Sequence, residues 1–368
     1  MLTVLIASLI GIHSSTQAVK PIVAPIKYPF GDPVISISVD GQPPQDFGLN
    51  MSSRHSIVVN KEDAGLLRQM SINGRNLGPA TLEYTDGPVR ASLSALGLGF
   101  LNGMAIGMDY AKNEVTLWPG GHLTPDVANA WVLAAPKWGS ESKVWTLPIQ
   151  RKVGVAPVIP ITINGKKINV LLRIGQQGTA FIHDEEPTAG IPVEYGQGGN
   201  QAILPNLEVG PTILPWILYF RGVKYDPSKE IDPSILGTFT TDNLLARRVI
   251  VDLPANALYV EQLSADEQVS MFLSTWFQLP IDVQGSKMVI REMPGTRAYP
   301  QLTPIYESEI LEIMGQSSVQ LLAAARGRTP ENIRYLKLLF ERIWNGYKVK
   351  FKMPNGDVHE ANFSPPKG

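Results

Sequence analysis

The sequence predicts a mostly β protein, built from two duplicated β lobes and a following α+β domain. Three observations support this fold class. Glycine, with 33 of 368 residues, and proline, with 30, both exceed their usual shares of about 7% and 5%, which is typical of many short strands joined by turns. One strand pattern occurs twice along the chain. After residue 262 it gives way to a pattern that mixes strands with a helix.

The composition excludes several classes of protein. Charged residues make up 18% of the chain and apolar residues 44%, so the chain is neither disordered nor a polyelectrolyte. With 32 basic and 33 acidic residues and no dense run of Lys or Arg, we expect no nucleic acid and no anionic membrane surface as a partner. The absence of cysteine excludes disulfides, thiol nucleophiles and cysteine-ligated metals. The length favours two or three domains.

The first 18 residues predict a signal peptide. An apolar run from Leu2 to Ile12 has signal-peptide length and is too short for a membrane span, and polar residues and the small Ala18 follow it. No Lys or Arg precedes the run, so a buried first strand or a retained anchor is the alternative. The signal-peptide interpretation implies export to the periplasm or the extracellular space, with no membrane association after cleavage.

An internal duplication organises residues 30–262. The first copy starts with an alternating strand at 34–39, an Asp-Gly turn and a second strand that ends at Asn50. The second copy repeats this order with a strand at 158–163, an Asn-Gly turn and a second strand that ends at Arg173. In each copy a loop rich in small residues leads into a third apolar strand.

The two copies also end alike. A short element containing Leu-Gly precedes a final strand pair, which carries Asp109 in the first copy and Asp252 in the second. Equivalent residues are 123 apart between Asn50 and Arg173, but 143 apart between Asp109 and Asp252, so the second copy contains a loop insertion. Chance similarity between hairpins would not reproduce both ends in the same order.

These residues resemble the lobe of retropepsin-like and pepsin-like aspartic proteases, doubled in one chain as in the bilobal members. The hairpin, the loop after it, the Leu-Gly element and the final strand come in the family's order. The resemblance implies that Asn50, in Leu-Asn-Met-Ser-Ser, and Arg173, in Leu-Arg-Ile-Gly-Gln, occupy the positions of the two catalytic aspartates.

Neither residue can replace an aspartate in this chemistry. Aspartic proteolysis needs two carboxylates that share one proton, one acting as base toward water and the other as acid toward the peptide carbonyl. Asn50 cannot ionise, and Arg173 stays protonated and cannot accept a proton. We therefore expect a pseudoprotease without catalytic residues. The alternative is an active exported endopeptidase whose carboxylates come from shifted positions such as Asp46 or Asp184.

No other catalytic pattern is present in the sequence. The five histidines lack metal-ligand spacing, and there is no Gly-x-Ser-x-Gly elbow. Ser52, Ser53 and His55 are close neighbours in the chain, and such neighbours seldom face one another as a nucleophile and its base. The cluster from His183 to Glu186 is expected to be a solvated loop rather than a weak metal site. We predict neither a cofactor nor a metal.

Arg173 has two interpretations that the sequence leaves open. Its guanidinium can pair with a carboxylate at the interface between the lobes. It can also act as an anion anchor in a cleft, where its planar fork would bind a peptide carboxylate through two hydrogen bonds.

The chain after residue 262 resembles a PDZ domain, as found at the end of exported bacterial proteins. A strand, a Pro-Gly turn, the Ile-Leu-Glu-Ile-Met-Gly strand at 310–315, a helix and an Asn-Gly hairpin come in that family's order. Glu307-Ser308 stands where the family usually has Gly-Asp, and no clear carboxylate-binding loop precedes residue 279. The predicted units are the signal peptide 1–18, the first lobe 30–120, a linker 121–150, the second lobe 151–262 and the PDZ-like domain 275–364.

The helix of this domain is predicted over residues 330–345. Thr329 is a suitable N-cap, Pro330 suits the first helical position, and Gly346 can adopt the left-handed conformation after the helix. The resemblance implies a groove between this helix and a strand near 277–283, which binds an extended segment or a protein C-terminus by strand addition.

The residues predicted to bind peptide are Phe277, Leu279, Ile281, Val283, Ile333 and Leu336, with Arg173 as a further candidate between the lobes. Because no carboxylate-binding loop is evident, we expect weak affinity. The alternative is that the apolar stripe of the helix is core and that the domain is a spacer. The oligomeric state does not follow from the sequence.

Overall fold

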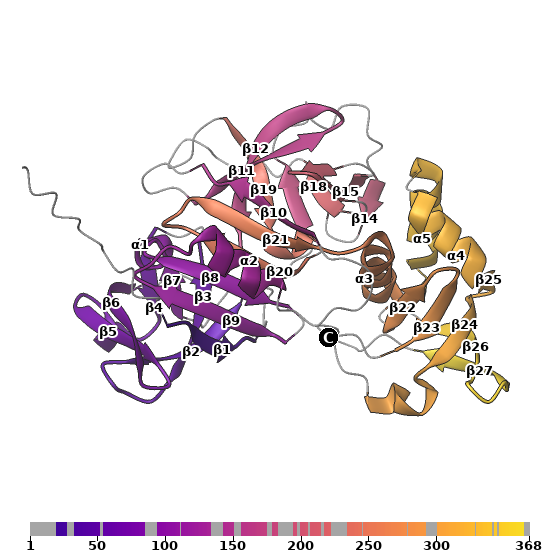
Figure 1. Cartoon of the computed structure of the whole chain (residues 1–368), viewed down its shortest axis with the longest axis horizontal. Coiled ribbons are helices and arrows are strands. Elements are labelled where there is room, and N and C mark those ends of the chain that lie inside the picture. Colours follow the sequence, from indigo (N-terminus) through magenta and orange to yellow (C-terminus); the bar gives the residue numbers. More distant parts are fainter. Residues whose placement is uncertain are drawn as a thin grey trace, which may run out of the picture.

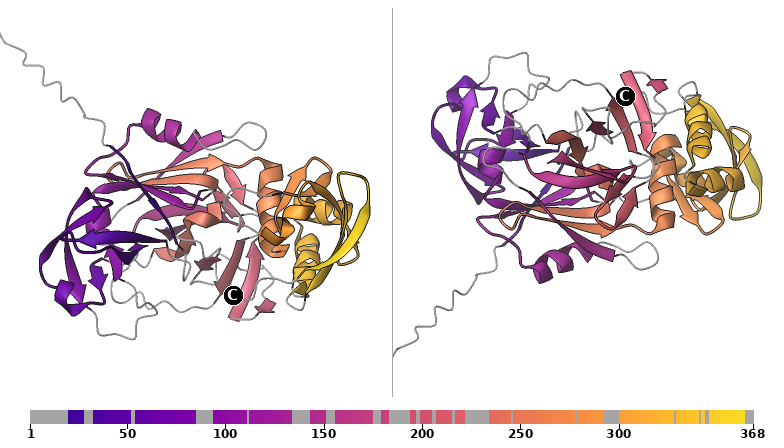
Figure 2. Two further views of the ribbon diagram at one scale, coloured as in Figure 1. Left: turned by 90° about the horizontal axis from the view of Figure 1, so that it is seen from below. Right: turned by 90° about the horizontal axis from the view of Figure 1, so that it is seen from above.

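The computed structural model shows two β lobes and an α+β unit in a row along the long axis of the molecule (Figure 1, Figure 2). The predicted fold class, mostly β with two duplicated lobes and a following α+β domain, is therefore confirmed. The structure describes residues 20–27, 33–51, 54–84, 94–110, 112–133, 143–150, 156–174, 179–182, 194–196, 199–204, 207–214, 217–221, 234–244, 246–277, 279–291, 300–327, 329–340, 342–343 and 346–363. The predicted signal peptide lies outside these residues.

The first lobe is a closed barrel with the strand order β2-β3-β7-β4-β6-β5. The turn after β2 has Asp40 and Gly41 at its centre with φ values of 47° and 75°, which is the left-handed pair of a type I′ turn. The elements of this lobe are β2 (Val34–Val39), β3 (Gln45–Asn50), β4 (Ser56–Val58), η1 (Lys61–Asp63), β5 (Leu67–Ile72), β6 (Arg75–Tyr84), β7 (Ser94–Gly97) and α1 (Leu98–Leu101).

The second lobe has the strand order β14-β15-β18-β13-β19-β12-β11-β16-β17. Its first hairpin turns at Asn164 and Gly165, again with positive φ values of 51° and 75°. Its elements are β11 (Val158–Ile163), β12 (Lys166–Arg173), β13 (Thr179–Ile182), β14 (Glu194–Gly196), β15 (Gly199–Leu204), β16 (Leu207–Val209), β17 (Thr212–Leu214), β18 (Ile217–Arg221), β19 (Ile235–Thr240) and η3 (Thr241–Leu244).

The pairings of the two lobes correspond strand by strand. In each lobe the second hairpin strand runs parallel to a later strand, β3 with β7 and β12 with β19. The third strand is parallel to a further strand, β4 with β6 and β13 with β18. The first strand is antiparallel to β5 in one lobe and to β16 in the other. The sequence repeat is therefore a repeat of topology. Where the first lobe has the single long hairpin β5/β6, the second lobe has the two pairs β15/β18 and β16/β17.

A six-stranded sheet with the order β1-β9-β8-β20-β21-β10 joins the lobes. It begins with β1 (Ile22–Pro25), β8 (Met104–Asp109) and β9 (Glu114–Pro119) and ends with β10 (Lys143–Pro148), β20 (Ala246–Asp252) and β21 (Ala257–Gln262). The central pair, β8 with β20, is antiparallel, and both strands are buried along their whole length. Helix α2 (Pro125–Leu133) packs on the second half of this sheet.

The register of the central pair places Asp109 opposite Arg248 and Ala105 opposite Asp252. Arg248 donates from Nε to Asp109 Oδ2 at 2.7 Å and from Nη1 to the Trp131 carbonyl at 2.6 Å, and its guanidinium lies 4.8 Å from the Trp131 ring centre. Both charged side chains are buried. A buried ion pair with further hydrogen bonds thus stabilises the junction of the lobes.

Asp252, the equivalent of Asp109 in the second half of this sheet, has different surroundings. It stands opposite the small Ala105 and not opposite an arginine. The backbone N–H groups of Leu123 and Ala255 donate to its two carboxylate oxygens at 2.8 and 2.9 Å. Burial raises the pKa of the Asp252 carboxyl, and the two backbone hydrogen bonds oppose this shift. Both aspartates of the final strands therefore have structural partners.

The C-terminal unit has its own apolar core and an antiparallel sheet with the order β22-β23-β24-β26-β27. Ser264 and Glu267 form a reciprocal capping box at the start of α3, and Arg247 of β20 pairs with Glu267. The elements are α3 (Ala265–Phe277), β22 (Ile281–Gln284), β23 (Lys287–Ile290), η4 (Pro300–Ile305), β24 (Ser308–Ile313), β25 (Gln316–Ser317), α4 (Ser318–Gly327), α5 (Pro330–Phe340), β26 (Tyr347–Lys352) and β27 (Val358–Phe363).

The structure differs from the sequence predictions in several elements. The segment 121–150, predicted as a linker, contains α2 and β10, and β10 pairs with β21 along its length. Helix α3 covers most of the segment between the predicted second lobe and the predicted PDZ-like domain, and the sequence predicted neither α3 nor α4. The predicted helix over 330–345 is α5, which ends at Phe340; the Thr329 hydroxyl caps its start by accepting from Asn332 N at 3.2 Å.

We predict that Arg248→Met destabilises the lobes by about 3–5 kcal/mol, because it leaves the Asp109 carboxylate buried without its cation. The free energy of unfolding would be measured by urea denaturation followed by tryptophan fluorescence. The double variant Arg248→Met with Asp109→Leu should recover most of the loss, since it removes both charges. Arg54→Met, at an exposed arginine of the first lobe, serves as control. A loss no larger than that of the control would contradict this role of the pair.

Candidate functional site

Asn50 and Arg173 lie at equivalent strand ends. Asn50 is the last residue of β3 and stands opposite Gly97 of the parallel strand β7. Arg173 is the last residue of β12 and stands opposite Thr240 of the parallel strand β19. Both side chains are half-buried. The loop residues 52–53 and 175–178, which follow these strand ends, are outside the described part of the chain.

At the end of β19, next to Arg173, several side chains carry hydroxyl and amide groups. Thr240 Oγ1 accepts a hydrogen bond from Asn243 Nδ2 at 2.9 Å. Thr241 Oγ1 lies 2.5 Å from the hydroxyl of Tyr110, which comes directly after β8 of the first lobe. These side chains are buried. The contact between Tyr110 and Thr241 holds η3 against the first lobe.

Asp242 is a carboxylate that the sequence analysis did not single out. It lies in η3, two residues after Thr240, the residue that pairs with Arg173. The Thr-Thr-Asp-Asn run after the Ile-Leu-Gly element is the signal that could have drawn attention to it. One carboxylate cannot replace a dyad, because the chemistry divides the roles of acid and base between two groups.

Asp46, one of the two shifted positions considered for catalysis, has structural partners. Its carboxylate accepts from Ser36 Oγ at 2.7 Å and from Lys27 Nζ at 3.2 Å. The hydrogen bond from Ser36, together with Lys27, holds the pKa of Asp46 below its usual value. In a catalytic dyad the two carboxylates contact each other and share one proton. These partners of Asp46 are a hydroxyl and an ammonium group, which is the environment of a structural carboxylate. Asp184 and the whole His183–Glu186 cluster lie outside the described residues.

The described residues also contain no metal-ligand cluster of three or more His, Cys, Asp or Glu side chains. Within the same residues, no helix is both long enough and apolar enough to cross a membrane.

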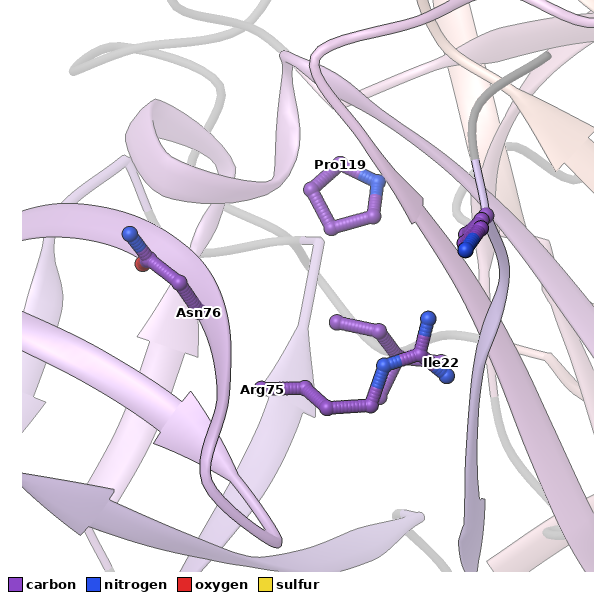
Figure 3. A pocket seen from close by; sticks show the side chains of 5 residues that line it. Ile22, Arg75, Asn76 and Pro119 are labelled. Atoms are coloured by element: carbon purple, nitrogen blue, oxygen red, sulfur yellow. The ribbon is translucent and has the colours of Figure 1, made fainter.

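An open pocket of about 290 Å³ lies beside the first lobe (Figure 3). Its lining residues are Lys20, Ile22, Arg75, Asn76 and Pro119. Arg75 Nη1 donates to the Pro21 carbonyl at 2.7 Å, so this guanidinium attaches the β5/β6 hairpin to the first strand. None of the predicted site residues lines this pocket.

The six residues predicted to line a peptide groove in the C-terminal unit are all buried. Their exposed fractions run from 0% for Ile281 to 5% for Val283, and each belongs to the apolar core of this unit. The set is Phe277, Leu279, Ile281, Val283, Ile333 and Leu336. These side chains pack within the protein and do not face an open groove in this structure.

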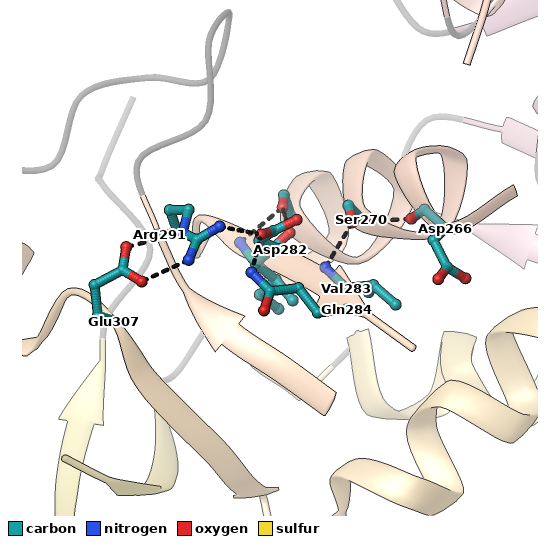
Figure 4. A network of polar contacts seen from close by, with 9 residues as sticks. Asp266, Ser270, Asp282, Val283, Gln284, Arg291 and Glu307 are labelled. Atoms are coloured by element: carbon teal, nitrogen blue, oxygen red, sulfur yellow. Dashed lines mark hydrogen bonds and ion pairs between the residues drawn. The ribbon is translucent and has the colours of Figure 1, made fainter. Parts of the chain in front are cut away.

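Helix α3 covers the outer edge of β22 with a row of polar side chains (Figure 4). Ser274 Oγ accepts from Ile281 N at 2.9 Å and lies 3.1 Å from its carbonyl oxygen, and Ser270 Oγ accepts from Val283 N at 2.8 Å. The Asp266 carboxylate continues the row, at 3.3 Å from Gly285 N.

The spacing of the polar side chains on α3 explains how they can reach successive outward N–H groups along the edge of β22. Four residues of an α-helix rise about 6.0 Å, and two residues of a strand advance about 6.7 Å. Asp266, Ser270 and Ser274 are four residues apart, and they meet every second residue of the edge. While α3 is in place, the N–H groups of Ile281 and Val283 are occupied. The strand addition predicted for the segment near 277–283 therefore has no free edge here.

A second polar network fixes the far end of the same hairpin (Figure 4). Arg291 donates to both carboxylate oxygens of Glu307, at 2.8 and 2.6 Å, and to Asp282 Oδ2 at 3.0 Å. The hydrogen bonds from Arg291 lower the pKa of Glu307. Glu307 has a φ of 66°, a conformation that glycine adopts without strain. Glu307 thus stands where PDZ domains usually have glycine, and its ion pair with Arg291 holds it in this conformation.

Comparisons with known proteins find solved structures that match at low sequence identity and low TM-score. No protein-family model and no curated protein matches the sequence. Among solved structures, an aspartic proteinase from Irpex lacteus is similar with a TM-score of 0.44 and 7% identity, over 67% of this chain and 98% of that chain. A retropepsin-like aspartic protease from Rickettsia conorii is similar with a TM-score of 0.26 and 16% identity, over 35% of this chain and 100% of that chain. These similarities carry no information on catalysis.

We predict that Ser270→Ala with Ser274→Ala destabilises the C-terminal unit by about 1–3 kcal/mol for each amide left without an acceptor. Hydrogen exchange of the Ile281 and Val283 amides should accelerate, as measured by NMR on the full chain. Ser286→Ala, at an exposed serine of the adjacent turn, is the matched control. Unchanged exchange of both amides in the double variant would show that α3 does not hold this edge.

Proposed function

We propose that the chain is an exported pseudoprotease: a noncatalytic protein of aspartic-protease-like fold that binds extended peptide or protein segments. The observation that carries the proposal is the identity of the two equivalent strand ends, Asn50 and Arg173. The parallel pairings of β3 with β7 and of β12 with β19 make these positions equivalent. An amide and a permanent cation at these positions cannot share a proton.

The partners of three further carboxylates support the noncatalytic assignment. Asp46 is ionised and paired with Lys27, Asp109 is paired with Arg248, and Asp252 accepts two backbone hydrogen bonds. Each of these groups already has a structural role in the described part of the chain. Export is proposed from the apolar run of the first residues. Binding of protein segments is proposed from the PDZ-like order of the C-terminal elements, at a site other than the β22 edge that α3 occupies.

We expect the purified protein to cleave an unfolded substrate such as reduced casein no faster than buffer does, from about pH 3 to 8, with no pepstatin-sensitive fraction. Product peptides would be quantified by mass spectrometry. The matched variant Asn50→Asp with Arg173→Asp places carboxylates at both strand ends. A gain of pepstatin-sensitive cleavage in this variant would support the positions as the former catalytic pair. Pepstatin-sensitive cleavage by the unaltered protein would refute the proposal and favour the endopeptidase alternative.

Substitution of Arg173 distinguishes two roles of its guanidinium: pairing within the protein and anchoring the anionic group of a ligand. It already has an interaction partner within the chain, so we expect Arg173→Met to lower the free energy of unfolding more than Arg54→Met does. Urea denaturation measures this difference, and a fluorescent peptide with a free C-terminal carboxylate reports binding. If stability is retained while binding of the carboxylate peptide is lost relative to its amide form, Arg173 is an anchor and the internal role is wrong.

A further inference from the structure

The sheet of the C-terminal unit has two edge strands, and their backbones face different surroundings. The edge of β22 is occupied by the hydroxyls of α3, as described above. β27 is the last strand at the opposite edge, and it pairs with β26 alone. Figure 1 and both views of Figure 2 show β27 at the outer rim of the unit. In the described part of the chain, no strand or helix lies beyond it.

The register shows which backbone groups of β27 point outward. Met353 N donates to the Asp357 carbonyl at 2.8 Å, so the odd-numbered residues of β27 bond to β26. On the other side of β26, Met314 N donates to the Lys348 carbonyl at 2.8 Å, which agrees with this alternation. The N–H and C=O groups of Val358, Glu360 and Asn362 therefore point away from the sheet. They span roughly 13 Å, enough for a segment of five or so residues.

One face of this edge carries three lysines, with glutamates beside them. Lys348, Lys350 and Lys352 follow one another at every second position of β26 and share a face with Val358 and Glu360. Lys348 pairs with Glu360 at 2.7 Å, and Lys350 pairs with Glu312 at 3.0 Å. Lys352 is exposed and has no ion-pair partner among the residues that the structure describes. It stands opposite Val358, which is 53% exposed, on β27. On β24 it stands opposite Glu309, which pairs with Lys287 at 3.2 Å.

The other face of the edge is apolar and aromatic. Phe363 stacks on Tyr347 with ring centres 5.9 Å apart, and His359 stacks on Phe351 at 6.0 Å. Ala361 lies between them on β27, partly buried against the core. A strand added beside β27 would place every second side chain against this face, and the remaining side chains beside the lysines.

We propose that β27 is the docking edge of this protein, and that it accepts an extended protein segment in which apolar and acidic residues alternate. This inference rests on the proposed binding function and names its site and partner chemistry. Strand addition supplies the backbone hydrogen bonds, the apolar residues cover Ala361 and Phe363, and the acidic residues approach Lys352 and its neighbours.

The test uses the full chain and the peptide acetyl-Val-Glu-Val-Glu-Val-Glu-amide, with acetyl-Val-Lys-Val-Lys-Val-Lys-amide as control. Binding is measured by isothermal titration, and the site by amide shifts in NMR. We expect the acidic peptide to bind about tenfold more tightly than the basic one, less so in high salt. Its largest shifts should fall on Val358, Glu360 and Asn362.

Glu360→Pro is the decisive variant. Proline removes an outward N–H and places its ring at the docking edge, while the bonds from β27 to β26 stay intact because they use the odd-numbered residues. We expect about a tenfold loss of affinity, the effect of one lost hydrogen bond and a blocked edge. Glu360→Ala is the matched control, since it removes the side chain but keeps the N–H, and it should bind the acidic peptide at least as well as the unaltered protein.

Three results would overturn the inference. The first is equal affinity of Glu360→Pro and Glu360→Ala for the acidic peptide. The second is no binding of that peptide by the unaltered protein, or shifts centred on β22. The third is self-association in sedimentation that Glu360→Pro abolishes, which would make a second copy the occupant. None of them bears on cleavage, so failure of the noncatalytic assignment shows separately as pepstatin-sensitive activity.

Discussion

The antiparallel pairing of β8 with β20 is the interaction on which the arrangement of the lobes depends. It joins the barrel of the first lobe to the sheet of the second, because β8 and β20 lie at the centre of a six-stranded sheet, with two further strands on each side of this pair. The pairing is symmetric in its backbone but not in its side chains. Arg248 neutralises Asp109 on one side, whereas on the other side backbone N–H groups take the place of a cation at Asp252. Backbone geometry can thus remain duplicated while the two halves satisfy their buried charges by different means.

Because of the same duplication, Asn50 and Arg173 occupy equivalent positions in the two lobes. At two equivalent strand ends, one lobe presents a neutral amide and the other a permanent cation. The scaffold can bring two side chains to matching places, but it cannot supply a group that shares a proton. Three aspartates of the lobes, Asp46, Asp109 and Asp252, have structural partners in Lys27, Arg248 and backbone donors.

In the C-terminal unit, one helix decides which sheet edge is open. The four-residue spacing of Asp266, Ser270 and Ser274 lets α3 satisfy β22 in the way that a neighbouring strand would. The apolar side of α3, including Phe272 and Leu273, is buried in the core of the unit. Moving the helix would therefore expose core side chains, at about 1.5–3 kcal/mol for each one. Hydrogen bonding and burial act together to close β22, and β27 remains as the edge with outward backbone groups.

The sequence by itself determined the features that depend on neighbours in the chain. These are the duplicated strands, the turns at Asp40-Gly41 and Asn164-Gly165, and the capped start of α5 at Thr329. Only the tertiary structure decided what each apolar stripe faces. Ile281 and Ile333 have the periodicity of a groove and of a core alike, because periodicity records that one side of an element is buried and not what covers it. For the same reason the sequence could not show that β10 joins the central sheet or that Ser270 and Ser274 meet β22. Those partners are far apart in the chain or belong to different kinds of element, and packing alone brings them together.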